Sequence, residues 1–214
     1  MYKYILFDLD GTITDPKVGI TKSFQYALRK YDIQEDDLDE LEKVIGPPLK
    51  DSFVDFYGFS EDKANEAIEC FREYFKDKGI FENIAYEGIE EVLSTLKKSG
   101  KTLAVSTSKP TVFAKRVLDY FKLTDYFEVI VGSHLDGSRS DKKEVIEETL
   151  NQLKVTSKDQ VIMIGDRKHD IVGAQKNNVD SIGVLYGYGS FEEMIAINPT
   201  HLVRDVKQLI NIIK

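Results

Sequence analysis

The chain alternates between short apolar segments and longer amphipathic ones. Five apolar runs and one shorter pair have the length of β-strands: residues 4–7, 102–105, 129–131, 161–164, 181–185 and 202–203. These runs lack the regular alternation of apolar and polar positions that one solvated face would produce. Such runs are typical of strands that are buried on both faces of a parallel sheet.

Amphipathic segments lie between these runs. Residues 89–98 carry apolar side chains at the 3.6-residue period of an α-helix: Ile89, Val92, Leu93 and Leu96. Four more segments favour helices: 112–121, 145–153, 170–177 and 206–213. Because strands and helices alternate, the predicted fold class is α/β, a doubly wound, Rossmann-like core with a parallel sheet and right-handed crossovers.

Residues 16–83 break this rhythm. They contain no convincing strand, and their pattern favours four helices: 20–31, 38–44, 49–57 and 61–78. Gly46-Pro47-Pro48 and Gly58 are the turn signals. A helical block after the first strand is expected to be an inserted, all-helical cap domain. The predicted domains are an α/β core of residues 1–15 and 84–214 and a cap of residues 16–83.

Composition narrows the classes of function. The 214 residues are 42% hydrophobic and 31% charged, which favours a packed protein, and the formal net charge of −8 argues against nucleic acid as a partner. A single cysteine, Cys70, excludes an internal disulfide and, with three scattered histidines, does not favour a zinc cluster. There is no secretory signal pattern and no apolar stretch near the roughly 18 residues of a membrane span. We expect a cytoplasmic protein without membrane contact, either monomer or dimer.

Polar side chains follow several of the predicted strands. Asp8 and Asp10 follow the first strand, Thr107 the second, and Asp166 the fourth, with Asp170 one helical turn later. Because ligands bind at the carboxyl ends of strands in open α/β sheets, these side chains are expected to converge. Carboxylates so close together repel one another unless a cation lies among them. Hard oxygen ligands with room for water and a phosphate suit Mg²⁺.

These residues also give the chain a resemblance to a known family. Asp8-Leu-Asp-Gly-Thr12, then Thr107, then Gly165-Asp166 with Asp170, occur in that order at strand ends. The chain resembles the haloacid-dehalogenase (HAD) superfamily, in its branch with a helical (C1-type) cap, and is similar to phosphoglycolate-phosphatase-like and 5′-nucleotidase-like members. The resemblance covers nearly the whole chain. It implies a Mg²⁺-dependent phosphomonoester hydrolase acting on a small phosphorylated metabolite, of the phosphoglycolate or nucleoside 5′-monophosphate type.

The resemblance implies a role for each motif residue. Asp8 would be the nucleophile that forms an aspartyl phosphate, and Asp10 the general acid and base. Asp166 and Asp170 would bind Mg²⁺ together with Asp8 and the backbone carbonyl of Asp10, and Thr107 would donate a hydrogen bond to a phosphoryl oxygen. Further substrate contacts are expected from three residues within or beside the motifs: Gly11, Thr12 and Ser108.

A lysine is expected to offset the charge of the transferring phosphoryl group. In the family this lysine precedes a proline and a helix, whereas residues 137–144 contain no proline here. Lys142 is the first choice, Lys143 the alternative, and Arg139 stays open. Ser108 departs from the asparagine of many relatives, and Lys109-Pro110 follow it, as in the phosphoglycolate-phosphatase group.

Three further segments invite a functional interpretation. In relatives, a cap loop such as the one at Pro47 reaches the substrate cleft, but a rigid turn explains this loop equally well. Arg72 could bind a substrate carboxylate or a second phosphate, although a solvated helix position explains it more simply. Tyr186-Gly-Tyr-Gly189 is interpreted as a flexible connector rather than a nucleotide loop.

Other functions stay open. A phosphosugar mutase of the same superfamily is disfavoured, because Ile20 and Leu49 stand near the places where such relatives carry a histidine and an arginine. A non-catalytic phosphate-binding or regulatory module on this fold is the alternative from another class, and the complete set of motif aspartates disfavours it. A flavodoxin-like receiver domain would also have acidic strand ends, but the helical insert argues against it.

Overall fold

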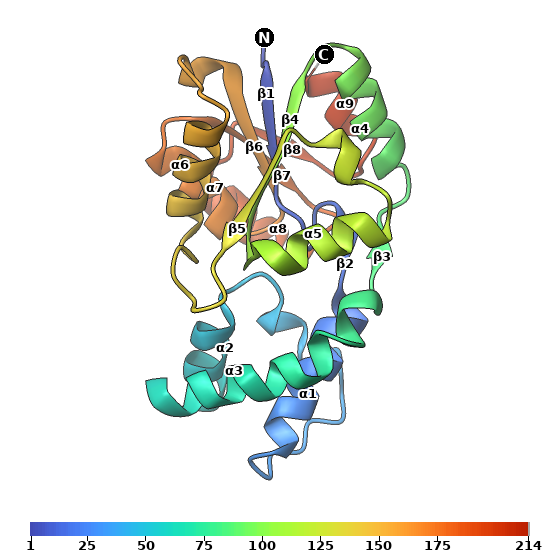
Figure 1. Ribbon diagram of the computed structural model, residues 1–214. Coiled ribbons are helices and arrows are strands. Elements are labelled where there is room, and N and C mark those ends of the chain that lie inside the picture. The colour runs from blue at the N-terminus through green and yellow to red at the C-terminus, as the bar shows by residue number, and fades with distance from the viewer. Residues whose placement is uncertain (214) are drawn as a thin grey trace. The chain divides into compact units, whose positions relative to one another are not determined.

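The chain divides into two compact units (Figure 1). The computed structural model describes residues 1–213. Unit 1 joins Met1–Asp15 to the chain from Ala85 onward, and unit 2 is Pro16–Ile84. The chain leaves unit 1 at the short strand β2 (Thr14–Asp15) and returns at β3 (Ile84–Ala85). The insert expected from the sequence, residues 16–83, differs from unit 2 by one residue.

Unit 1 is built on one sheet of six parallel strands. In chain order they are β1 (Tyr4–Phe7), β4 (Thr102–Pro110), β5 (Val129–Ser133), β6 (Val161–Gly165), β7 (Asp180–Val184) and β8 (His201–Val203). Their order in the sheet is β5-β4-β1-β6-β7-β8, and every neighbouring pair is parallel. The strand order reverses next to β1, and ligands bind at such a reversal in open α/β sheets.

The strands β4, β1 and β6 are aligned with one another at the point where β1 ends. Phe7 of β1 pairs with Val105 of β4 on one side and with Ile164 of β6 on the other. Their apolar side chains are buried because both faces of the sheet are covered. The residues that follow these positions therefore emerge at the same edge of the sheet.

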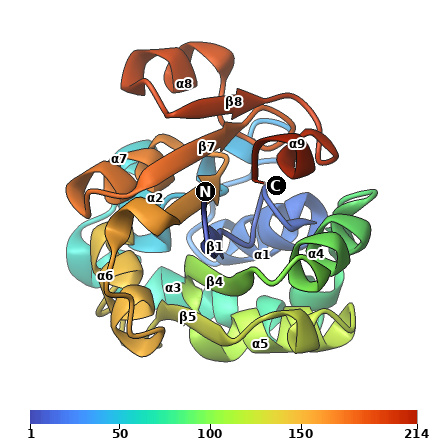
Figure 2. The same cartoon turned by 90° about the horizontal axis from the view of Figure 1, so that it is seen from above.

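Six α-helices accompany the sheet in the described part of unit 1. They are α4 (Ile89–Lys98), α5 (Thr111–Tyr120), α6 (Lys142–Gln152), α7 (Lys168–Lys176), α8 (Phe191–Ile197) and α9 (Gln208–Ile213). Helices α6 and α7 pack together on one face of the sheet, and α4 and α9 pack together on the other (Figure 2). The doubly wound α/β core predicted from the sequence is confirmed.

Unit 2 is helical and has its own core. Its helices are α1 (Lys17–Arg29), α2 (Leu49–Tyr57) and α3 (Glu61–Phe75), with two short 3-10 helices, η1 (Glu42–Val44) and η2 (Gly79–Phe81). The ring of Phe24 stacks on that of Phe53 at a centroid distance of 4.1 Å and meets Phe71 edge-on at 6.5 Å. These rings belong to three different helices and join them.

One predicted helix is wrong. Residues 38–44 form turns and the 3-10 helix η1 instead of an α-helix. The apolar residues Leu38, Leu41 and Val44 are three apart, which is the repeat of a 3-10 helix. The backbone bonds follow that repeat, since the N–H of Leu41 donates to the carbonyl of Leu38 and the N–H of Val44 to that of Leu41.

The remaining predicted strands and helices are present, with ends shifted by a few residues. Within residues 1–213, no helix has both the length and the apolar composition that a membrane crossing requires.

Candidate active site

Three carboxylates meet at the C-terminal edge of the sheet. Asp8 follows β1, Asp166 follows β6, and Asp170 lies in the first turn of α7. One oxygen of each carboxylate lies within 4.8 Å of the others, and all three residues are buried. The structure thus brings together the three aspartates that the sequence assigns to a metal.

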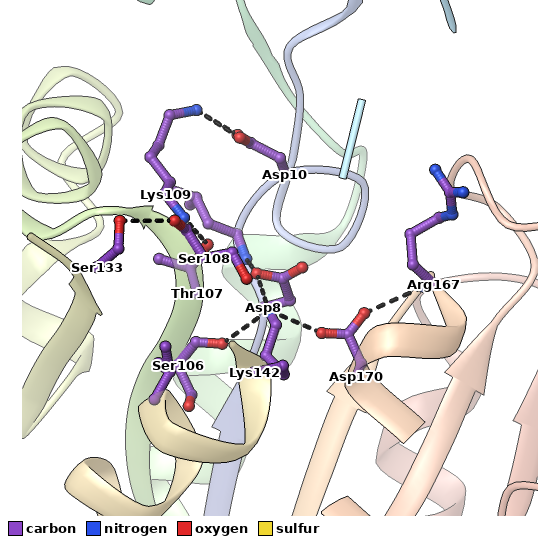
Figure 3. A network of polar contacts seen from close by, with 12 residues as sticks. Asp8, Asp10, Ser106, Thr107, Ser108, Lys109, Ser133, Lys142, Arg167 and Asp170 are labelled. Atoms are coloured by element: carbon purple, nitrogen blue, oxygen red, sulfur yellow. Dashed lines mark hydrogen bonds and ion pairs between the residues drawn. The ribbon is translucent and has the colours of Figure 1, made fainter. Parts of the chain in front are cut away.

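One buried lysine lies among these carboxylates (Figure 3). Nζ of Lys142 is 2.9 Å from Oδ1 of Asp8 and 2.8 Å from Oδ1 of Asp170, and it donates to the backbone carbonyl of Ser106 at 3.2 Å. Burial alone would lower the pKa of Lys142, but Asp170 and Asp8 raise it above its ordinary value, so the side chain stays an ammonium ion.

The geometry at the start of α6 explains why Lys142, and not Lys143, is the buried lysine of the cluster. Asp141 is the N-cap, and its carboxylate accepts the N–H of Lys143 at 2.8 Å. Lys142 is therefore the first helical residue and is buried, whereas Lys143 is exposed. Arg139, the third cation considered, donates to the carbonyl of Gly132 instead.

Asp10 forms an ion pair with a second lysine, Lys109, to which the sequence analysis gave no role. Nζ of Lys109 lies 2.7 Å from Oδ1 and 2.5 Å from Oδ2 of Asp10. Burial raises the pKa of Asp10 above its ordinary value, and Lys109 acts in the opposite direction. Strand alternation could not have found this contact, because the register between β4 and β5 shifts between Ser106 and Pro110.

The hydroxyl residues of β4 have different partners. Thr107 is buried, and its Oγ1 accepts the N–H of Lys109 at 3.3 Å. Ser108 donates its hydroxyl to the carbonyl of Ser140 at 3.1 Å, and its own carbonyl accepts the hydroxyl of Ser133. The Ser108 side chain thus connects β4 to the segment before α6.

Burial strongly affects the acids of the cluster. Burial raises the pKa of Asp166 well above its ordinary value, and repulsion from Asp170 and Asp8 raises it further. Burial also raises the pKa of Asp170 to about 6, although the Lys142 ammonium lowers it. Three carboxylates face one ammonium ion, so the cluster has an excess of negative charge when it is ionised.

This excess charge fits a divalent cation. Oδ1 of Asp166 is buried and has no hydrogen-bond partner within residues 1–213. A buried oxygen without a donor is costly unless a cation supplies the missing interaction. Carboxylate oxygens are the ligands that Mg²⁺ prefers, so the residues present fit the metal that the sequence implied.

The other predicted contact residues fall into two groups. Gly11 and Thr12 are buried in unit 1 directly after Asp10, and Gly11 has a φ of +80° that favours glycine. Pro47 and Arg72 belong to unit 2, where Pro47 lies in the turn before α2 and Arg72 on α3 contacts Glu69 at 2.5 Å. Their contacts with substrate stay predictions.

A buried acidic cluster with one lysine, at the strand reversal of a doubly wound sheet, is suited to binding and transferring a phosphoryl group. Comparison with known proteins agrees with this class. The model of the haloacid dehalogenase-like hydrolase family matches residues 5–184, and the chain belongs to this family.

Three similar proteins extend the comparison. A 5′-nucleotidase from Pseudomonas aeruginosa is 47% identical over 97% of this chain and 94% of its own length. A crystal structure from Clostridium acetobutylicum, described as a predicted phosphatase, has a TM-score of 0.97 and 52% identity over 100% of this chain and 98% of that one. The tyrosine-protein kinase PtkA of Mycobacterium tuberculosis is 37% identical over 86% of this chain and 62% of its own length. The chain is a hydrolase of this family and a phosphatase.

Proposed function

We propose that the protein is a Mg²⁺-dependent phosphatase that hydrolyses small phosphate monoesters through an aspartyl phosphate on Asp8. The observation that best supports this proposal is the position of the Lys142 ammonium group, 2.9 Å from Asp8 and 2.8 Å from Asp170. It supplies a buried positive charge beside the proposed nucleophile. The name of the Pseudomonas aeruginosa relative favours nucleoside 5′-monophosphates as substrates, with phosphoglycolate as the alternative.

The metal would be held by the side chains of Asp8, Asp166 and Asp170 and by the backbone carbonyl of Asp10. When bound, it would offset the negative charge of the phosphoryl oxygens. Lys142 would offset the same charge from within the protein, and the hydroxyl of Thr107 would donate a hydrogen bond to a phosphoryl oxygen.

In the first step, a carboxylate oxygen of Asp8 attacks phosphorus and forms a new P–O bond. The bond between phosphorus and the ester oxygen breaks, and Asp10 gives its proton to that leaving oxygen. The raised pKa of Asp10 supports this role, because burial favours the protonated carboxyl group that the step requires.

In the second step, Asp10 acts as a base. It accepts a proton from water while the water oxygen attacks the phosphorus of the aspartyl phosphate. The bond to Asp8 breaks, inorganic phosphate leaves, and Asp10 is protonated again. Lys109 supports this half of the reaction because its charge stabilises the carboxylate form of Asp10.

The test is phosphate release from a panel of monoesters by wild type and Asp8→Asn, with Mg²⁺ and with EDTA. The panel contains nucleoside 5′-monophosphates, phosphoglycolate and sugar phosphates. We expect turnover of one class by wild type, a loss of at least about 10³-fold in Asp8→Asn, and no turnover in EDTA. Asp62→Asn, at an exposed position of α3, is the matched control and should retain full activity.

The rival functions predict different results. A mutase would isomerise a sugar phosphate without net phosphate release. A non-catalytic module would release no phosphate from any ester, and Asp8→Asn would change nothing. Turnover in EDTA equal to that in Mg²⁺ would remove the metal from the proposal.

A further inference from the structure

A loop outside the sequence motifs contacts Asp166. The segment Tyr186-Gly-Tyr-Gly189, here called the YGYG loop, lies between β7 and α8 in unit 1. The sequence suggested a flexible connector; the segment does connect β7 to α8, but it also has specific hydrogen-bond partners. The loop makes hydrogen bonds through its backbone and through both tyrosine hydroxyls.

The two carboxylate oxygens of Asp166 differ in their hydrogen bonding to the YGYG loop. The N–H of Tyr188 donates to Oδ2 of Asp166 at 2.8 Å. Oδ1 of the same carboxylate is buried and has no hydrogen-bond partner within residues 1–213. One oxygen is thus fixed by the loop, while no donor competes with a cation for the other.

Glycines at two positions permit this close approach. A Cβ on Gly187 would lie 2.3 Å from the carbonyl oxygen of Gly11 and 2.4 Å from Cβ of Asp166. A Cβ on Gly189 would lie 1.9 Å from the carbonyl oxygen of Asp166. Neither glycine has a positive φ, so the backbone conformation alone does not require glycine there. Glycine is required there because a side chain would have no space beside Asp166.

The tyrosines fix the YGYG loop to the last residue of the first motif, Thr12, and to Asp15 three residues later. The hydroxyl of Tyr186 donates to the carbonyl of Thr12 at 3.0 Å, and that of Tyr188 donates to the carboxylate of Asp15. The loop therefore contacts the chain after β1 and the carboxylate after β6 at the same time. Both segments contribute to the candidate metal site.

We propose that the YGYG loop is a positioning element of the divalent-cation site. It holds the Asp166 carboxylate through Oδ2, so that Oδ1 is oriented for a cation, and it fixes this carboxylate relative to residues 11–15. The proposal rests on the proposed function at one point, namely that a divalent cation binds at Asp166. Hydrogen bonds to a ligand side chain of this kind alter metal affinity by about 10–100-fold.

The experiment measures Mn²⁺ binding by the full-length protein without substrate, from the EPR signal of the free aquo ion. Gly187→Ala should raise the Kd for Mn²⁺ by about 10–100-fold, because the methyl group displaces the loop or Asp166. Gly100→Ala is the matched control. Gly100 has a φ of +80° and no atom within 4 Å of an added Cβ, so this change strains the backbone without touching the site. Its Kd should stay within about twofold of wild type.

The outcomes separate this inference from the proposed function. A folded Gly187→Ala with the wild-type Kd would overturn the positioning role and leave the metal site intact. An equal loss in Gly100→Ala would also overturn it, because the effect would then follow general destabilisation. A wild-type protein that binds no Mn²⁺ would overturn both proposals.

A second measurement needs no variant and covers the case in which Gly187→Ala does not fold. Hydrogen exchange of the Tyr188 amide is followed in the wild-type protein, with and without Mg²⁺. The hydrogen bond to Asp166 should slow this exchange at least about tenfold relative to an unstructured peptide in both conditions. Exchange at the unprotected rate in both would overturn the proposal.

Discussion

Two adjacent lysines at the start of α6 differ in burial and in their contacts. Lys142 is buried against Asp8 and Asp170, while Lys143 is exposed. Lys142→Met keeps the length of the side chain but removes its charge, so kcat should fall by at least about 10²-fold, the usual loss for one charge-stabilising group. Lys143→Met should stay within about threefold of wild type. Steady-state kinetics at saturating Mg²⁺ test both, and similar losses in the two variants would contradict the assignment.

The carboxyl groups of the cluster should make binding of the proposed Mg²⁺ depend on pH. Burial raises the pKa of Asp170 from 3.8 to about 6. An acid with a higher pKa in the folded state binds its proton more tightly there, so without metal the free energy of unfolding falls as pH rises through this window. Mg²⁺ requires the ionised carboxylates. Stabilisation by Mg²⁺ should therefore increase over the same range.

The measurement is the shift in Tm caused by excess Mg²⁺ relative to EDTA, at about pH 5 and about pH 7. We expect the larger shift at pH 7. Burial lowers the pKa of His169, which gives the opposite pH dependence, but this contribution is present with and without metal and largely cancels in the difference. Asp166→Asn should abolish the Tm shift caused by Mg²⁺ at both pH values. An equal shift at pH 5 and pH 7 in wild type would contradict the prediction.

The aspartates could be located from the sequence, whereas Lys109 could not. Asp8 and Asp166 directly follow strands, and the level ends of parallel strands bring such residues together. The contact of Lys109 with Asp10 depends on the path of a long, flexible side chain from β4. The predicted strand ended at Val105, and the register of β4 shifts between Ser106 and Pro110, so strand periodicity gives neither the face of Lys109 nor the partner of its ammonium group.

At the scale of elements, the first turn of α6 links helix stability to the site. Asp141→Ala removes the N-cap bond to the N–H of Lys143 and should cost about 1 kcal/mol of unfolding free energy. Because Lys142 is the first helical residue, the same change should also lower kcat. Asp141→Asn retains a capping side chain and should restore most of both losses. Urea unfolding and steady-state kinetics of the two variants test this.

A loss of stability in Asp141→Ala without any loss of kcat would show that Lys142 is held by its ion pairs alone. A loss in Asp141→Asn as large as that in Asp141→Ala would show that the charge of Asp141, rather than the cap, is responsible.

Element boundaries show where periodicity stops being informative. The strand β4 continues to Pro110, well past the apolar run 102–105. Its second half consists mainly of polar residues, which an apolar pattern does not detect. Residues 38–44 have apolar positions three apart, which a short sequence window does not separate from an α-helical pattern. The YGYG loop contains neither period, so only its contacts with Asp166 show that it is structured.

At the scale of the whole molecule, each unit has a separate hydrophobic core. In unit 1, Leu6, Ala104 and Met163 of the sheet pack with residues of α6 and α7. In unit 2, Phe24 and Phe53 are fully buried and stacked. The insertion of one unit between two segments of the other could be recognised from the change in periodicity, because each unit satisfies its own pattern.

Separate cores predict separate responses to equivalent substitutions. Phe24→Ala in unit 2 and Phe7→Ala in unit 1 remove rings that are both fully buried, and each should cost about 3–5 kcal/mol in its own unit. Hydrogen exchange with mass spectrometry should show Phe24→Ala losing protection in peptides from α1 to α3, while peptides from β1, β4 and β6 retain it. Phe7→Ala should show the reverse. Equal loss of protection throughout the chain in both variants would mean that the two units unfold as one cooperative structure, since a local opening exposes only the amides of its own unit.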